Sequence, residues 1–164
     1  MTSSDPAVPR PRLPFHTTRE TRIEADLAID AHASACWKAV VDFDAYDHWN
    51  PVFRHIDGAR ACGRTGHVKV CDRVNSLVEV KIRLLLSEPP VALAWRWSIP
   101  GLAEHAPEQY FYIDSTPGGA SHVFLGTSFT GPFARPVVAA LSCLVEPMLQ
   151  DICSALKTRV ERQA

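Results

Sequence analysis

Two stretches of this sequence hold side chains that could move protons. One contains Tyr46 and His48, and the other, bounded by prolines, contains Glu104 and His105. An imidazole titrates near neutral pH and suits general acid–base catalysis, and a phenol can donate a hydrogen bond to a developing enolate. If both stretches face a common cavity, they could catalyse proton transfer on a carbonyl compound. The alternatives are solvated surface histidines and a solvated loop.

Gln109 follows the second stretch and falls on the apolar side of a predicted strand. A buried amide without hydrogen bonds is destabilising, so Gln109 should either pair with backbone near the strand end or orient a ligand carbonyl. Trp95 and Trp97 lie in phase on the preceding strand. Their flat rings and N–H groups suit an aromatic or polyene ligand, and they suit core packing equally well.

Other catalytic chemistries lack their motifs. The sequence has no G-x-S-x-G elbow and no spacing of three or four ligands typical of zinc. It has no C-x-x-C pair either. We therefore expect a site without metal or cofactor, and cysteines that serve as small buried apolar residues in a reducing compartment. The five cysteines are Cys36, Cys62, Cys71, Cys143 and Cys153.

The elements that must position these residues begin with a strand and two short helices. Residues 22–29 alternate polar and apolar, which predicts a half-buried strand. Residues 34–41 carry an apolar stripe and predict a helix with Ser34 as its cap. Residues 44–49 predict one or two further turns, which Pro51 ends.

Six more strands are predicted between about residues 52 and 129. Each run is rich in apolar residues and ends at Gly, Pro or Asp. The clearest run, residues 78–84, has one apolar and one charged face, which indicates an antiparallel sheet. The predicted ranges are 52–56, 66–72, 78–84, 93–99, 109–114 and 121–129.

A long helix is predicted from about residue 135 to residue 160, where apolar residues recur every three or four positions. Pro147 should kink or interrupt it. One helix cannot fill the space against a strongly curved seven-stranded sheet. We therefore expect a mostly apolar cavity of roughly 300–1,000 Å³ between them.

The inward-facing side chains would line this cavity, and each aliphatic one among them could equally be plain core. Trp49 is placed at the mouth, where the short helices meet the second strand. The predicted ligand-binding residues are Trp49, Val80, Ile82, Leu93, Trp95, Trp97, Phe111, Leu125, Thr127, Phe129, Leu141, Val145 and Met148.

Two segments resemble the SRPBCC superfamily, the START, birch-allergen and polyketide cyclase/dehydrase group. They are residues 29–51, which include the Tyr-Asp-His-Trp-Asn-Pro run, and the Gly-Thr-Ser-Phe-Thr-Gly run of residues 126–131. The order of elements matches from about residue 21 to the C-terminus. The resemblance implies an α+β helix-grip fold. In that fold a curved seven-stranded antiparallel sheet wraps around a long C-terminal helix, and two short helices follow the first strand.

The resemblance also implies a hydrophobic ligand between the sheet and the C-terminal helix. Polyketide-cyclase-like members often place a His on the penultimate strand, and a His and a Glu on the last strand. The matching positions here are Gln109, Leu125 and Thr127. These differences remove charge from the predicted pocket.

Length and charge bound the remaining possibilities. The 164 residues predict one domain, residues 21–164, after an extension of residues 1–20 that holds four prolines and should be disordered or loosely attached. Seventeen Lys/Arg against eighteen Asp/Glu, a net charge of -1, argue against nucleic-acid and anionic-membrane partners. No run approaches about 18 uninterrupted apolar residues, and no signal peptide is evident, so we expect a cytoplasmic protein.

The predicted function is that of a cofactor-independent cyclase, dehydratase or isomerase of biosynthetic type, in the lyase or isomerase class. It would act on a polyketide-like or other hydrophobic carbonyl compound, as a monomer or homodimer. The predicted catalytic residues are Tyr46, His48, Glu104, His105 and Gln109. The alternative is a non-catalytic carrier for a lipid or aromatic molecule, which the scarcity of charged pocket residues favours. A regulator that binds another protein remains a third possibility.

Overall fold

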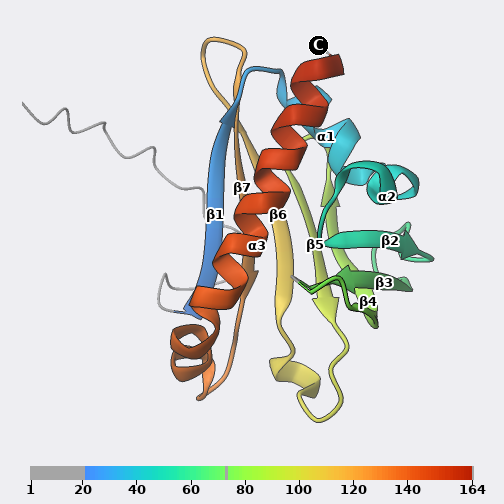
Figure 1. The fold of residues 1–164 in the computed structure, drawn as a ribbon, viewed down its shortest axis with the longest axis vertical. Coiled ribbons are helices and arrows are strands. Elements are labelled where there is room, and N and C mark those ends of the chain that lie inside the picture. Colours follow the sequence, from blue (N-terminus) through green and yellow to red (C-terminus); the bar gives the residue numbers. More distant parts are fainter. Residues whose placement is uncertain (1–20, 73, 164) are drawn as a thin grey trace, which may run out of the picture.

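The computed structural model describes residues 21–72 and 74–163, so the predicted N-terminal extension lies outside the described residues. Seven strands, two short helices and one long helix follow one another along the chain, with two single turns of 3-10 helix between them (Figure 1). In order they are β1 (Arg22–Ile29), α1 (Ala33–Val41), η2 (Phe43–Ala45), α2 (Tyr46–Trp49), β2 (Phe53–Asp57), β3 (Thr65–Cys71), β4 (Leu77–Glu88), β5 (Ala92–Trp97), η3 (Ala103–His105), β6 (Glu108–Ser115), β7 (Ser121–Ser128) and α3 (Ala134–Gln163).

The seven strands form one antiparallel sheet in the order β1-β7-β6-β5-β4-β3-β2. Strands β2 to β6 each pair with the next strand in sequence, and β1 pairs with β7 along its whole length. Figure 1 shows α3 lying across one side of this sheet, with α1 and α2 beside its C-terminal end. The predicted helix-grip α+β fold is confirmed.

Two bulges interrupt the regular alternation of the strands. The register shifts between Phe53 and His55 in β2, and between Leu84 and Leu86 in β4. A bulge bends its strand and increases the local twist, so both contribute to the curvature of the sheet. The bulge in β2 also places Phe53 and Ile56, three positions apart, on the buried side.

Helix α3 is continuous from Ala134 to Gln163 with Pro147 inside it, so the predicted interruption is wrong. Its two halves pack differently. The second half buries a stripe of apolar residues that includes Ile152, Leu156 and Val160. From Arg135 to Met148, by contrast, no residue is fully buried, because this half stands away from the sheet.

By length and mean hydropathy, α3 is long and apolar enough to cross a membrane, and it alone meets this criterion in the described part of the chain. The expectation that no segment would approach such a span rested on unbroken apolar runs. Glu146 and Asp151 interrupt the run in α3 without removing its apolar character. A core helix of a soluble protein passes the same test.

Local details of the short elements differ partly from the sequence prediction. Helix α1 begins at Ala33, one residue before Ser34, and His32 occupies the cap position without a side-chain hydrogen bond. Asn50 shapes the turn before β2, because its Oδ1 accepts the N–H groups of Val52 and Phe53 at 3.0 and 2.8 Å.

The cysteines fit the buried apolar role only in part. All five are free, and Cys36 and Cys153 are buried as expected. Burial raises the pKa of the Cys153 thiol to about 12, which keeps it protonated. Cys62 and Cys143 are exposed, so the prediction is wrong for them.

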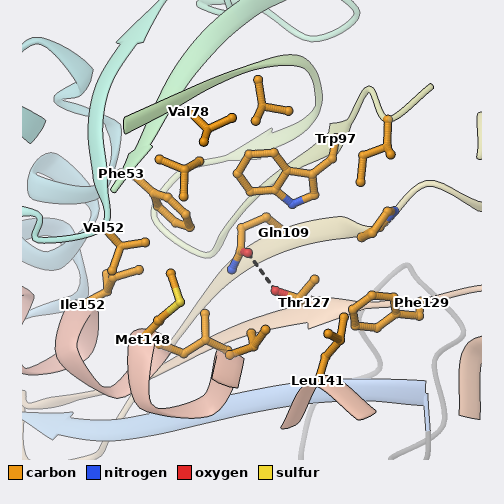
Figure 2. Close-up of a pocket in the computed structure, with 16 residues that line it drawn as sticks. Val52, Phe53, Val78, Trp97, Gln109, Thr127, Phe129, Leu141, Met148 and Ile152 are labelled. Carbon is orange, nitrogen blue, oxygen red and sulfur yellow. Dashed lines mark hydrogen bonds between the residues drawn. The ribbon is translucent and has the colours of Figure 1, made fainter. Parts of the chain in front are cut away.

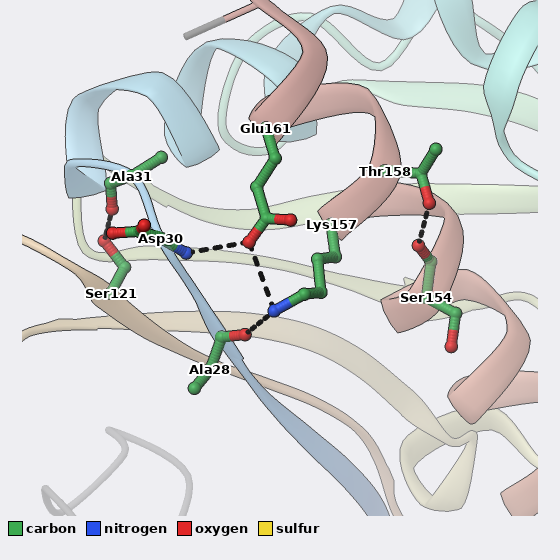
Figure 3. A network of polar contacts seen from close by, with 8 residues as sticks. All are labelled: Ala28, Asp30, Ala31, Ser121, Ser154, Lys157, Thr158 and Glu161. Carbon is green, nitrogen blue, oxygen red and sulfur yellow. Dashed lines mark hydrogen bonds and ion pairs between the residues drawn. The ribbon is translucent and has the colours of Figure 1, made fainter.

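Polar contacts anchor the C-terminal half of α3 to the end of β1 (Figure 3). Lys157 Nζ donates to the Ala28 carbonyl at 2.8 Å and lies 3.1 Å from Glu161 Oε1. The same Glu161 oxygen accepts the backbone N–H of Asp30 at 3.0 Å. One ion pair on the helix therefore satisfies two backbone groups just where β1 ends.

Gly126 lets an aromatic side chain cross the outer face of the sheet. Tyr110 on β6 reaches over β7, and its hydroxyl donates to Glu24 Oε2 on β1 at 2.6 Å. A Cβ atom at Gly126 would lie 2.2 Å from the Tyr110 oxygen, closer than any real contact. The glycine of the Gly-Thr-Ser-Phe run is therefore required by packing.

We expect Gly126→Ala to destabilise the protein by about 1–3 kcal/mol, because the new methyl group overlaps the Tyr110 ring. Urea denaturation measures the loss. Gly118→Ala is the matched control, since a Cβ at Gly118 would meet no atom within 4 Å. Equal stability of the two variants would contradict the assigned role of Gly126.

Glu161→Gln should lower the stability in a pH-dependent way. The Asp30 N–H and then Lys157 lower the pKa of the Glu161 carboxyl below its usual 4.5, so the ionised carboxylate stabilises the folded state. The stability gap between wild type and variant should be complete above about pH 4.5 and shrink as the pH falls through the lowered pKa. Thermal unfolding at a series of pH values measures the gap. Glu146→Gln, at an exposed position on the same helix, should show no such gap.

Candidate functional site

A cavity of about 350 Å³ lies between the sheet and the first half of α3 (Figure 2). Sheet, loops and helix all contribute to its wall. The lining residues are Val52, Phe53, Val70, Val78, Val80, Trp97, Ile99, Pro107, Gln109, Thr127, Phe129, Leu141, Val145, Met148, Leu149 and Ile152. Val78 is 55% exposed and Ile99 is 39% exposed, so the cavity opens between the start of β4 and the loop after β5.

One polar pair interrupts the apolar wall. Gln109 and Thr127 are opposite each other in the register of β6 and β7. The Thr127 hydroxyl donates to Gln109 Oε1 at 2.8 Å, and Gln109 Nε2 donates to the Gly126 carbonyl at 2.9 Å. An amide has two N–H groups and two acceptor positions on its oxygen, so Gln109 keeps one of each for a ligand.

Aromatic rings form the wall beside this pair. The Phe53 ring lies 5.8 Å from Trp97, and Trp95 packs behind both rings at 5.6 and 6.1 Å. In Figure 2 the indole nitrogen of Trp97 lies on the ring edge that faces Gln109. The flat faces and this N–H suit a ring-containing ligand with a polar group near Gln109.

Of the predicted lining residues, seven line the cavity together with Gln109. They are Val80, Trp97, Thr127, Phe129, Leu141, Val145 and Met148. Five others face the same side of the sheet but pack in the closed hydrophobic core instead of lining the cavity. These are Ile82, Leu93, Trp95, Phe111 and Leu125, each at most 1% exposed. The alternation of apolar and polar residues correctly predicted which side of the sheet these residues face. It does not predict where α3 moves away from the sheet and leaves a cavity.

Other residues that line the cavity lie outside the predicted ligand-binding set. Val70 and Val78 have the inward phase expected of the pocket wall, and Leu149 and Ile152 belong to the buried stripe of α3. Strict alternation could not predict that Phe53 lines the cavity, since it would place Phe53 and Ile56 on opposite faces of the sheet. The β2 bulge brings it inward.

Tyr46 does not line the cavity, contrary to its predicted place. It is fully buried, and its hydroxyl donates to the Val40 carbonyl at 2.6 Å. Burial raises the pKa of the Tyr46 phenol far above its usual value. Its ring packs edge-on against Phe43 and Trp49. The observed contacts are those of a structural residue that joins α1 to α2.

The predicted histidines also lie away from the cavity wall. His48 is exposed and lines, with Trp49, a separate groove between α2 and α3. His105 is exposed in η3, and its ring packs so close to Gly131 that a Cβ there would lie 2.7 Å from Nδ1. The side chain of Glu104 lies outside the described residues. Among the predicted catalytic residues whose side chains the structure describes, only Gln109 therefore lines the cavity.

The cavity wall carries no titratable side chain among the described residues. The described part of the chain also contains no group of three His, Cys, Asp or Glu residues placed to hold a metal ion. The arrangement can surround a neutral, mainly apolar molecule and exchange hydrogen bonds with it at Gln109, Thr127 and Trp97.

Residues 20–161 match the family described as polyketide cyclase / dehydrase and lipid transport. The chain belongs to this family. The resemblance seen in residues 29–51 and 126–131 is thereby confirmed at the level of the superfamily. Among curated proteins, none matches the sequence significantly.

Solved structures with the same fold include proteins of biosynthetic pathways. The Zhui aromatase/cyclase from Streptomyces sp. R1128 is 16% identical, with a TM-score of 0.66 over 87% of this chain and 94% of that one. A START superfamily protein from Mycobacterium smegmatis is 19% identical, with a TM-score of 0.66 over 87% and 99% of the two chains. The di-domain ARO/CYC StfQ from the steffimycin pathway is 11% identical, with a TM-score of 0.67 over 87% of this chain and 51% of that chain.

Proposed function

We propose that this protein binds a neutral, polyketide-like or other ring-containing carbonyl compound in the cavity between the sheet and α3. The observation that carries the proposal is the Gln109–Thr127 pair, which offers hydrogen bonds in an otherwise apolar wall. A charged ligand would lose its hydration there without meeting an opposite charge, so the wall favours neutral molecules. The volume of about 350 Å³ is at the small end of typical ligand cavities.

A cofactor-independent cyclase or dehydratase is the second candidate. The family description and the aromatase/cyclase title of one structural relative support it. Without a titratable group on the described wall, catalysis would depend on holding a flexible chain in a reactive conformation, with Gln109 and Trp97 stabilising an enolate. Chromatography of bound ligand after incubation separates the two candidates, because a carrier returns the compound unchanged.

Leu141→Trp should abolish ligand uptake, because the larger side chain fills the cavity. The neutral aromatic ketone Prodan, whose emission shifts to the blue in apolar surroundings, is the probe. Leu144→Trp is the matched control on the same helix, since Leu144 is 53% exposed and does not line the cavity. Prodan binding that survives Leu141→Trp, or that is absent from the wild type, would refute the cavity as the ligand site.

Gln109→Leu should weaken Prodan binding several-fold, since one hydrogen bond contributes about 1 kcal/mol. Anthracene, an aromatic hydrocarbon that forms no such bond, should bind the variant and the wild type alike. Gln150→Leu is the matched control, because Gln150 is exposed on α3 and does not line the cavity, so this variant should bind Prodan like the wild type. Equal losses for both probes would show that Gln109 shapes the wall rather than recognising a carbonyl.

A further inference from the structure

A second hollow, which we call the α2–α3 groove, lies between α2 and the last three turns of α3. Its volume is about 500 Å³, and its walls are far more polar than those of the cavity. The lining residues are His48, Trp49, Ser154, Ala155, Thr158, Arg159, Arg162 and Gln163. Neither the predicted function nor the family description assigns it a role.

The two sites use different faces of α3. Met148, Leu149 and Ile152 line the cavity, whereas Ser154 and Thr158 project toward the groove. Figure 3 shows Ser154 and Thr158 on the side of the helix away from Lys157 and Glu161. A ligand in the groove would therefore touch neither the cavity nor the contacts that anchor α3 to β1.

The groove carries positive charge and hydrogen-bond donors. Arg159 and Arg162 lie one turn apart, and no Asp or Glu lines the groove in the described part of the chain. Asp42 pairs with Arg159 at 3.0 Å from the side of α1. His48 and Arg162 have no hydrogen bond or ion pair with any other described residue, so their donors are available to a ligand.

Two of the side chains that line the groove each carry a buried donor without an acceptor. The indole Nε1 of Trp49 and the Nε of Arg159 are both buried without a hydrogen-bond partner among the described residues. The Arg159 guanidinium lies 6.0 Å from the centre of the Trp49 ring, so the two unsatisfied donors belong to neighbouring side chains. A buried donor without an acceptor is destabilising, so an acceptor group at this place would be favourable.

We propose that the α2–α3 groove binds an oxyanion group, such as a phosphate monoester or a carboxylate. Guanidinium groups form paired hydrogen bonds with both kinds of anion, and Ser154 adds a hydroxyl at the groove wall. The carbonyl groups at the C-terminal end of α3 carry partial negative charge, so an anion requires the arginines to be held there. The groove thus selects charged ligands, whereas the cavity selects neutral ones.

The test is a titration of the full-length protein with inorganic phosphate at neutral pH and constant ionic strength, balanced with chloride. The Trp49 indole N–H signal in a nitrogen–proton NMR spectrum reports binding, and Trp49→Phe identifies that signal. We expect a saturable shift with phosphate. Acetate is the second probe: saturation with both anions indicates that one carboxylate suffices, and saturation with phosphate alone indicates a phosphate group.

Arg162→Gln should weaken the phosphate response at least about tenfold, because a charge-assisted contact is lost. Arg162 is exposed, so the fold should tolerate this change, and the melting temperature checks it. Arg64→Gln removes the same charge from the exposed β2–β3 connection and should leave the response unchanged. A response that does not saturate with either anion, or that Arg162→Gln leaves intact, would overturn the proposal.

Discussion

The partial cover that α3 gives to the curved sheet is the constraint on which the rest of this structure depends. The second half of the helix buries Ile152, Leu156 and Val160 and is tied to β1 by Lys157 and Glu161. The first half is apolar but has no fully buried residue before Leu149 apart from Ala134. A single helix cannot follow a sheet that bends at two bulges, so space remains where the two diverge.

The chemistry of that space follows from which residues the sheet presents to it. Aliphatic and aromatic side chains cover almost all of the wall, and the one amide on the β-strands is already bonded to its neighbours. Because Thr127 and the Gly126 carbonyl hold the Gln109 amide in place, a ligand meets a preorganised polar group. A preorganised neutral pair discriminates between ligands by hydrogen bonding without requiring that any group be ionised.

Gly126 links this inner pair to the outer face of the sheet. Its carbonyl accepts from Gln109, while its missing side chain makes room for Tyr110 to reach Glu24. The same residue therefore takes part in contacts among β6, β7 and β1 on both faces of the sheet. Charged side chains lie on the outer face of the sheet, as Glu24 does, and in the α2–α3 groove, whereas none of the described residues that line the cavity is charged.

The sequence by itself determined the element order, the antiparallel sheet, the long helix and the inward face of most strands, because periodicity reports which side of an element is buried. It also placed Gln109, Thr127 and Trp97 in the cavity, since each falls in phase with apolar neighbours. Only the tertiary structure decided how deeply each inward-facing residue is buried. Trp95 and Leu125 pack in the hydrophobic core, whereas Trp97 and Thr127 line the cavity. Only the tertiary structure shows that Tyr46 and His48 lie away from the cavity and that Phe53 lines it. Burial depth and bulges depend on how α3 and the curved sheet diverge, and that contact is set between residues far apart in the chain.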